Sequence, residues 1–385
     1  MSDLASPLTV DADGHVLEPV DTWERYIDPA FRDRALRVGI DDDGFENLFI
    51  DGRPTMMLKG RLGALGGIEA EGDEKLALQT PGNRTYAEGA PEGGYDPAAR
   101  LAVLDAEGID QVLLYPTIGI AWEGSVRDPE LATAYARAYN RWIVDFCSAA
   151  PKRLFPVAHI SLIDEAGAVA EVQRAREAGC VGVYLSPDLP ARGGRSLADP
   201  AFDRFWGTVQ DLEMPIAFHV VARENSTFVR WSQLPDGRAD GVFAFAFLAI
   251  EVMAAFTQLV TTGVLERYPR LKCSVLEAGS NWICAWLDRL DHKFEMGGFE
   301  TPMKRKPSDY FRRQCVISAD PDETLTAPVI EHLGADYCIW ASDYPHLDAS
   351  MGVVAEIRER LATLPVDTQH KVLGGNAAKF YGISD

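Results

Sequence analysis

The segment WASDYPH (residues 340–346) follows an apolar run and brings a carboxylate and an imidazole directly after it. A second segment of the same kind, DADGHVLE (residues 11–18), lies close to the start of the chain. In a barrel of parallel strands, side chains at the strand ends collect at the carboxyl-terminal mouth, where they can bind a metal ion. The two segments therefore predict a barrel with a metal-binding mouth.

Between the two segments, short apolar runs alternate with stretches that have helical periodicity, which is typical of an α/β protein. The expected strands after the opening one are residues 111–115, 154–159, 181–185, 215–219, 271–276, 315–318 and 337–341. The expected helices are residues 97–108, 129–149, 165–179, 200–212, 242–256, 282–295 and 323–333. Eight strands with helices between most of them predict a (β/α)8 TIM barrel, and a single domain over residues 1–385 accommodates all of them.

Residues 19–95 form a long region without strong periodicity, placed directly after the first strand. The region holds an acidic turn at residues 41–44, a small hairpin at 49–53 and a glycine-rich passage from 60 to 94. Long excursions of this kind are usually functional or flexible. We therefore expect an insertion that forms a lid over the mouth of the barrel.

The charge of the chain restricts its partners. Its 385 residues include 37 Lys and Arg against 58 Asp and Glu, which gives a formal net charge of -21. We therefore do not expect the protein to bind nucleic acid or anionic membranes, and we expect its partner to be a small-molecule substrate. No basic segment followed by an apolar one begins the chain, and its six cysteines form no CxxC pair. These two features predict a cytoplasmic protein with reduced thiols.

Residues 242–256 are almost entirely apolar. The stretch is shorter than the roughly 20 residues that a membrane-spanning helix needs, and it contains Glu251. We interpret it as a helix buried in the core or at a subunit interface, which makes a homodimer possible.

Carboxylates and imidazoles gather at the ends of the expected strands, where a barrel brings distant residues together. The candidate metal ligands are Asp13, His15, Glu18, His219, Glu277, Asp343 and His346. Each has a simpler alternative as a structural hydrogen-bonding group: Glu18 can precede a helix that starts at Pro19, and Glu277 can orient a ligand imidazole. The candidate substrate-contacting residues are His159, Tyr115, Tyr184 and Trp282. The three aromatic residues can equally be core residues.

The chain resembles the amidohydrolase-related family, a branch of the metal-dependent amidohydrolase superfamily that includes aminocarboxymuconate semialdehyde and resorcylate decarboxylases. The resemblance is carried by residues 13–19, 197–203, 215–219, 342–346 and 374–382. It implies that Asp13 and His15 correspond to the first-strand ligand pair and His219 to the fifth-strand metal histidine. It also implies that Asp343 is the eighth-strand aspartate, which binds metal and handles a proton.

Two departures from the family pattern concern the metal. The family often has His-Gly-Gly after the sixth strand, where this chain has Glu277-Ala278-Gly279, and the first-strand pair here is Asp-x-His. The candidate set then holds four carboxylates, more than one divalent ion needs, so one or two ions per chain are possible. Oxygen ligands mixed with imidazole suit Mn and Fe at least as well as Zn.

Three functions remain open at this point. The leading one is a metal-dependent hydrolase or non-oxidative decarboxylase that acts on a small organic acid or a cyclic ester or amide, with His219 and Asp343 as catalytic residues. An alternative is a dinuclear nonheme iron oxygenase, with Fe/Fe or Fe/Mn, that hydroxylates a small molecule. A third is a metal-binding assembly partner without catalysis. Substrate specificity is expected to depend on residues 19–95 and 221–240.

Overall fold

The computed structural model describes residues 7–55, 58–221 and 241–383. Eight parallel strands form one sheet in the order β1-β5-β6-β7-β8-β9-β10-β11. These strands are β1 (Val10–His15), β5 (Gln111–Tyr115), β6 (Leu154–His159), β7 (Gly182–Leu185), β8 (Ile216–Phe218), β9 (Cys273–Val275), β10 (Cys315–Ala319) and β11 (Cys338–Trp340). The predicted (β/α)8 TIM barrel is confirmed, with every expected strand in place.

The first strand also meets the segment that follows the last one, which nearly closes the sheet into a barrel. The backbone N–H of Asp343 donates to the carbonyl of Asp13 over 3.0 Å, and the N–H of His15 donates to the carbonyl of Tyr344 over 2.7 Å. Residues 11–18 and 340–346 are therefore neighbours in space.

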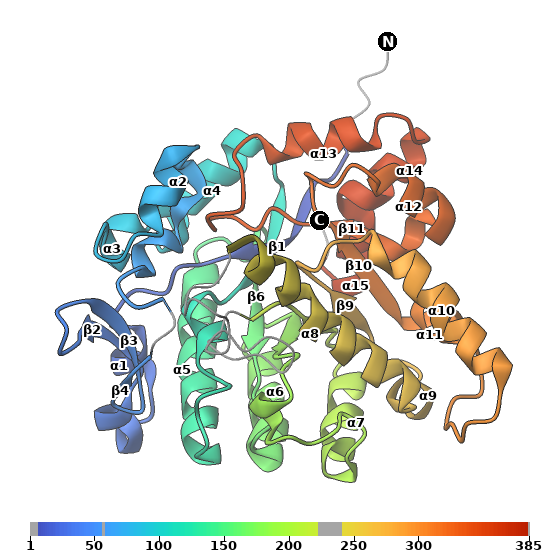
Figure 1. Ribbon diagram of the computed structural model, residues 1–385, viewed down its shortest axis with the longest axis horizontal. Helices are drawn as coiled ribbons and strands as arrows, with labels where there is room; N and C mark the ends of the chain where they lie inside the picture. Colours follow the sequence, from blue (N-terminus) through green and yellow to red (C-terminus); the bar gives the residue numbers. More distant parts are fainter. Residues whose placement is uncertain (1–6, 56–57, 222–240, 384–385) are drawn as a thin grey trace.

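Helices surround the strands, with α5, α6 and α7 on one side and α12, α13 and α14 on the other (Figure 1). The main helices are α4 (Pro97–Glu107), α5 (Pro129–Cys147), α6 (Glu165–Glu177), α7 (Asp203–Asp211), α8 (Gly241–Thr261), α9 (Val264–Arg267), α10 (Trp282–Met296), α11 (Pro307–Gln314), α12 (Thr326–Leu333), α13 (Val353–Leu361), α14 (Val366–His370) and α15 (Asn376–Tyr381). Aspartates 96, 128 and 164 accept hydrogen bonds from the first turns of α4, α5 and α6, which explains where these helices begin.

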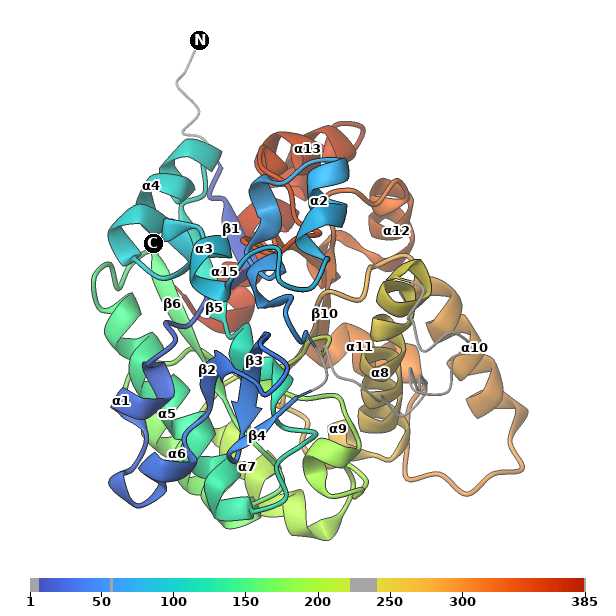
Figure 2. The ribbon, with the colours of Figure 1, turned by 60° about the vertical axis from the view of Figure 1, so that its left-hand side comes forward.

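The region between β1 and α4 forms a small three-stranded sheet of β2 (Arg37–Ile40), β3 (Glu46–Ile50) and β4 (Arg53–Pro54), together with short helices. The expected hairpin at residues 49–53 corresponds to the β3–β4 pair. The short helices include α1 (Thr22–Tyr26), η2 (Leu62–Ala64), η3 (Gly67–Glu69), α2 (Asp73–Leu78) and α3 (Tyr86–Gly89). Figure 2 shows the small sheet in front of the barrel, with α2 and α3 above it.

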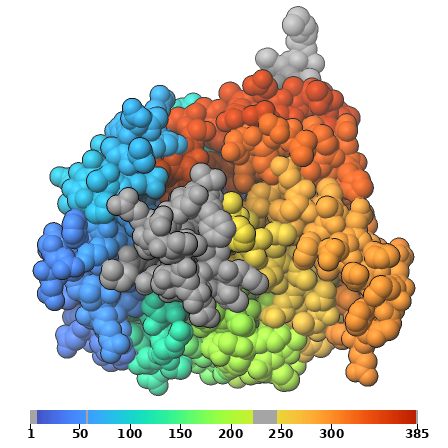
Figure 3. Space-filling model, viewed as in Figure 1, coloured from blue at the N-terminus to red at the C-terminus, as the bar shows by residue number. Residues whose placement is uncertain are grey.

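This insertion, in blue to cyan, borders the red carboxyl-terminal part of the chain in Figure 3. One contact between the two is a hydrogen bond from the backbone N–H of Ile68 to the carbonyl of Pro345 (3.3 Å), in the segment that also carries Asp343 and His346. The insertion therefore reaches the carboxyl-terminal end of the last strand, which is where a lid would have to lie. Closure over a substrate stays a prediction.

The apolar stretch at residues 242–256 lies within α8. No helix among the described residues is long and apolar enough to cross a membrane. The side chains of residues 241–245, which include part of this stretch, lie outside the described part of the chain. The homodimer expected from this stretch stays a prediction. All six cysteines are free thiols, as expected, and five of them are buried.

Candidate metal centre

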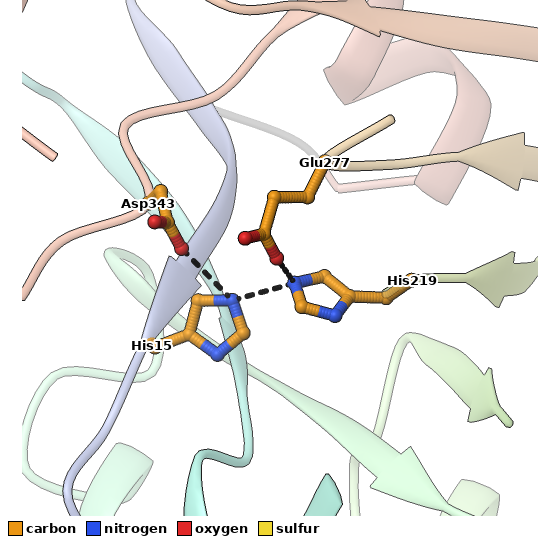
Figure 4. A group of neighbouring side chains, drawn as sticks. All are labelled: His15, His219, Glu277 and Asp343. Atoms are coloured by element: carbon orange, nitrogen blue, oxygen red, sulfur yellow. Dashed lines mark hydrogen bonds and ion pairs between the residues drawn. The ribbon is translucent and has the colours of Figure 1, made fainter. Parts of the chain in front are cut away.

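Four side chains from four different strand ends converge at the mouth of the barrel. His15 ends β1, His219 follows β8, Glu277 follows β9 and Asp343 follows β11. One ligand atom from each lies within 4.8 Å of every other. Figure 4 shows the chain of contacts: Asp343 to His15 at 3.5 Å, His15 to His219 at 2.9 Å, and His219 to Glu277 at 2.7 Å. We call these four residues the metal-binding cluster.

Both histidines of the cluster have one ring nitrogen occupied by the backbone. Nδ1 of His15 lies 2.9 Å from the carbonyl oxygen of Pro116, and Nδ1 of His219 lies 2.7 Å from the carbonyl oxygen of Val220. A carbonyl only accepts, so each Nδ1 carries the proton and each Nε2 keeps a lone pair. The two Nε2 atoms are 2.9 Å apart. Two lone pairs at this distance repel each other, and a shared cation removes the repulsion.

Asp13 adds a carboxylate to the same place, although its oxygens lie slightly farther away. Its Oδ1 is 3.5 Å from Nε2 of His15, and its Oδ2 is 3.6 Å from Nε2 of His219. Oδ1 is buried and accepts no hydrogen bond from the residues that the structure describes. Burial raises the pKa of Asp13 well above its usual value, although His219 opposes the rise. A cation among these groups would stabilise the ionised carboxylate, so the donor set fits a divalent metal ion.

Electrostatics around the cluster favour neutral imidazole and penalise unpaired carboxylates. Burial lowers the pKa of His15 well below its usual value, and the nearby His346 and His219 lower it further. Burial also raises the pKa of Glu277 well above its usual value, with Asp343 and Asp348 adding to the rise. Neutral imidazole and ionised carboxylate are the forms that bind metal, and a cation supplies the charge that the carboxylates lack.

The backbone at two cluster residues is in the left-handed region. Glu277 has φ 46° and Asp343 has φ 54°, and neither is glycine. Residues other than glycine adopt this conformation at a cost and cluster at functional sites. Glu277 lies two residues after β9 and Asp343 three residues after β11, and their carboxylates lie beside the two histidines of the cluster (Figure 4).

A second group of ligand atoms overlaps the first. Glu277, Asp343, His346 and Asp348 also offer atoms that lie within 4.8 Å of one another. Nδ1 of His346 is 2.6 Å from Oδ1 of Asp343, and its Nε2 is 2.8 Å from the hydroxyl of Thr117. Glu277 and Asp343 belong to both groups, so the two groups share these carboxylates.

Glu18, a candidate ligand in the sequence, is not part of either group. Its carboxylate accepts hydrogen bonds from the backbone N–H groups of Thr117 (3.2 Å), Ile118 (2.8 Å) and Gly119 (3.0 Å). These N–H groups belong to the first turn of η5 (Ile118–Ala121) and have no partner within it. The carboxylate is used to satisfy this turn, and we leave Glu18 out of the proposed ligand set.

Three of the four candidate substrate-contacting residues lie around the cluster. The ring centroid of Tyr115 is 6.2 Å from that of His219, and the centroid of Tyr184 is 6.3 Å from it. The ring of His159 is 4.8 Å from that of Tyr184. Trp282 begins α10, and its ring packs against Phe256 at 6.0 Å. No ring contact among the described residues connects Trp282 with the cluster.

A group of hydrogen bonds holds the first and last strand ends together beside the cluster. The carboxylate of Asp11 accepts from the backbone N–H of Ser342 (2.9 Å) and from its hydroxyl (2.6 Å). The guanidinium of Arg100 donates to the carbonyl of His15 over 2.8 Å. These bonds fix the backbone next to Asp343 and at His15, which is the usual way in which a protein orients metal ligands.

Asp348, Thr117 and Glu123 were not among the residues predicted from the sequence. Asp348 lies two residues beyond His346, so the spacing of the two could have indicated it. Thr117 and Glu123 lie in the loop after β5, and nothing in their local sequence distinguishes them. Glu123 contacts His159, whose position in the sequence is 36 residues away, so the pairing depends on the folded barrel.

Comparisons with known proteins identify the family of this chain. The family model described as amidohydrolase matches residues 10–383. This chain belongs to the amidohydrolase family. Gamma-resorcylate decarboxylase from a Rhizobium species is 25% identical over 255 residues, which cover 64% of this chain and 76% of that protein.

Two solved structures share the fold. An amidohydrolase from Mycobacterium avium subsp. paratuberculosis has a TM-score of 0.80 at 22% identity, covering 98% of this chain and 100% of that one. A dihydroxybenzoic acid decarboxylase from a Polaromonas species, with bound manganese and the inhibitor 2-nitroresorcinol, has a TM-score of 0.64 at 18% identity. That similarity covers 98% of this chain and 97% of the Polaromonas chain.

Proposed function

We propose that this amidohydrolase is a divalent-metal-dependent lyase or hydrolase that acts on a small organic acid or a cyclic ester or amide. The observation that carries the proposal is the convergence of the Nε2 atoms of His15 and His219, 2.9 Å apart, each with its other ring nitrogen against a carbonyl. Asp13 and Asp343 complete a set of two imidazoles and two carboxylates. Decarboxylase relatives in the same family support the lyase side of the proposal.

When bound, a divalent ion supplies Lewis-acid chemistry, because it polarises a coordinated carbonyl or carboxylate and acidifies coordinated water. Asp343 is the proposed proton carrier. Burial disfavours the protonated form of His346, but the charge of Asp343 and the hydrogen bond with it outweigh burial and raise the pKa of His346 to about 9. His346 is therefore protonated at neutral pH, and its Nδ1 donates to Oδ1 of Asp343 over 2.6 Å.

Mixed oxygen and imidazole ligands suit manganese, iron and zinc, with no thiolate to favour zinc. We propose manganese or iron as the native metal, because the set is rich in carboxylates. The manganese in the Polaromonas decarboxylase supports this choice.

Elemental analysis of protein purified without added metal tests the proposal directly. We expect at least one manganese, iron or zinc ion per chain. Replacing His219 by Ala should remove most of this metal and abolish turnover, while the fold remains, because the barrel core does not depend on the site. His292, which is exposed on α10, provides the matched control His292→Ala. A His219→Ala protein with the metal content of wild type would overturn the proposal.

A second candidate, a dinuclear enzyme that activates dioxygen to hydroxylate a small molecule, is favoured by the overlap of the two ligand groups at Glu277 and Asp343. Asp13, Glu277, Asp343 and Asp348 carry up to four negative charges, and protonated His346 balances one of them. One divalent ion balances two more, so a second ion would balance the charge that remains. Carboxylates can bridge two ions, as this arrangement requires.

Glu277→Ala separates the two candidates. If Glu277 connects two ions, the metal count should fall from about two to about one per chain, because alanine cannot bridge. If Glu277 only orients His219, the count should hold while metal affinity falls by roughly 10- to 100-fold. Oxygen consumption by the Fe(II)-loaded wild type is the functional readout. Wild type that never exceeds one ion per chain, even with excess Fe or Mn, would eliminate the dinuclear candidate.

A further inference from the structure

A row of three aromatic rings leads away from the metal-binding cluster along neighbouring strands. Phe155, Val157 and His159 are alternate residues of β6, and the first two pack inside the barrel, so His159 faces the interior as well. His159 is the register partner of Tyr184 on β7. Ring centroids are 4.8 Å apart from His159 to Tyr184 and 6.3 Å apart from Tyr184 to His219.

His159 has a buried carboxylate partner. Oε2 of Glu123, in the loop after η5, lies 3.0 Å from Nε2 of His159, and both side chains are almost fully buried. The ring of Trp122 packs on the same imidazole, with 5.0 Å between centroids. A carboxylate at this distance favours the proton on Nε2 and leaves the lone pair on Nδ1.

The backbone of His159 is held in place from outside the barrel. The side-chain amide of Asn140 on α5 donates to the carbonyl of His159 (3.0 Å) and accepts from its N–H (2.7 Å). Asn140 also donates to the buried carboxylate of Glu171 over 2.8 Å. The arginines that pair with Glu171 are Arg137 and Arg174. The end of β6 is therefore a rigid support for His159.

Polar atoms around this imidazole remain available for a ligand. Both ring nitrogens of His159, Oε2 of Glu123 and Nε1 of Trp122 are buried and have no hydrogen-bond partner among the residues that the structure describes. The contact of Nε2 with Oε2 is an ion pair without hydrogen-bond geometry. More than about 90% of buried polar groups in proteins are partnered, so the unpartnered atoms on His159 and the adjoining Trp122 are available to a bound group. They are not metal ligands, because neither ligand group of the mouth includes His159 or Glu123.

Tyr184 connects this region with the cluster. The hydroxyl of Tyr184 is buried and has no hydrogen-bond partner among the described residues, so the phenol has a hydrogen bond to donate. Its ring centroid lies 4.8 Å from that of His159 and 6.3 Å from that of His219, which places the ring between the two regions.

We propose that His159 and Tyr184 form a subsite beside the metal-binding cluster that takes a hydroxyl group of the substrate, with Glu123 as the positioning residue for His159. A hydroxyl donates to the lone pair on Nδ1 of His159 and accepts from the phenol of Tyr184. It therefore matches the unused acceptor on the imidazole and the unused donor on the phenol. The inference rests on the proposed function, in which the metal holds the other end of the same small molecule. It assigns specificity for a hydroxylated substrate to residues that do not bind the ion.

Calorimetric titration of the manganese-loaded protein tests the subsite with two probes. The first probe is 2-nitroresorcinol, which carries two hydroxyls, and the second is nitrobenzene, which carries none. We expect wild type to bind 2-nitroresorcinol. His159→Gln and Tyr184→Phe should weaken this binding by roughly 10- to 100-fold, the usual effect of losing a hydrogen bond in a buried site. Glu123→Gln keeps the shape of the side chain and should weaken it by about 10-fold through the altered imidazole.

Controls distinguish specific recognition from damage to the fold. His332→Gln, at an exposed position of α12, should bind both probes as wild type does. The subsite variants should keep the manganese content of wild type and its affinity for nitrobenzene. Manganese-loaded wild type that does not bind 2-nitroresorcinol, or variants that bind it equally well, would overturn the subsite alone. Wild type that holds no metal would overturn the proposed function and the subsite with it.

Discussion

Glu18 illustrates, at the scale of a single residue, how burial decides the role of a carboxylate. The side chain is fully buried and accepts hydrogen bonds from three consecutive backbone N–H groups, of which the shortest, from Ile118, is 2.8 Å. Burial raises the pKa of Glu18 from its ordinary 4.5 to about 7, because it outweighs the three hydrogen bonds that favour the charge. The folded protein therefore holds a proton here that the unfolded chain releases.

The raised pKa predicts a pH dependence of stability. The contribution of Glu18 is fully present below pH 4.5 and is lost as the pH rises through 7, since only the folded state keeps the proton in that window. The loss is at most about 3 kcal/mol. Glu18→Gln has no proton to lose, so its free energy of unfolding, measured with urea on metal-free protein, should rise relative to that of wild type between pH 4.5 and 8. Parallel curves for the two proteins would contradict the assignment.

At the scale of elements, the glycine-rich passage from 60 to 94 has a structural explanation besides mobility. A Cβ at Gly89, on α3, would lie 2.0 Å from the carbonyl oxygen of Gly63, on η2, so these two backbones are in direct contact. A Cβ at Gly66 would meet the carbonyl oxygen of Gly89 at 2.4 Å. Several of the glycines that suggested a flexible lid therefore allow close packing of short helices next to the mouth.

Alanine substitutions test this explanation. Gly89→Ala should lower the free energy of unfolding by roughly 1–3 kcal/mol, because two backbones must separate to admit the methyl group. Gly207 on α7 is the matched control, since its Cβ would have no neighbour closer than 3.8 Å, on Tyr268. Gly207→Ala should be neutral or stabilising by up to about 1 kcal/mol. Thermal unfolding of both variants measures these changes. A Gly89→Ala protein as stable as wild type would show that the backbones at Gly89 and Gly63 are not tightly packed.

At the scale of the whole molecule, the carboxyl-terminal helix α15 covers the end of the barrel opposite the cluster. The hydroxyl of Tyr381 lies 3.0 Å from that of Tyr115 and 2.7 Å from that of Ser274, inside the barrel. The ring of Tyr381 also lies against Gly182, where β7 begins. The side chain of Tyr381 therefore fills the end of the barrel opposite the cluster. The ring of Tyr115 contacts His15 and His219 from that same end.

Removing the hydroxyl of Tyr381 should affect stability but not metal binding. Tyr381→Phe leaves two buried hydroxyls without this partner, so the free energy of unfolding should fall by roughly 1–3 kcal/mol. The metal content should match that of wild type, because the ring of Tyr115 keeps its place under the cluster. Tyr95→Phe, at an exposed tyrosine, is the control. A loss of metal in Tyr381→Phe would mean that the hydroxyl network also positions the ligands.

Local sequence patterns were enough to predict the order of the strands, the barrel, and the strand-end positions of His15, His219, Glu277 and Asp343. These features depend on local patterns: apolar runs of strand length, helical periodicity between them, and a polar residue where each run stops. The closure between residue 13 and residue 343 follows from the barrel itself. Local patterning is sufficient because every parallel strand in such a sheet ends at the same mouth.

The contacts among the polar residues at the mouth, in contrast, depend on the folded structure. Glu18 and Asp348 are both carboxylates near a ligand histidine in the sequence, but the first satisfies the turn at residues 117–119 and the second joins the group with His346. The pairing of Glu123 with His159 also depends on the neighbouring positions of β5 and β6. Loop conformation sets these contacts, and it is decided by packing between segments that lie tens to hundreds of residues apart, which no local pattern records.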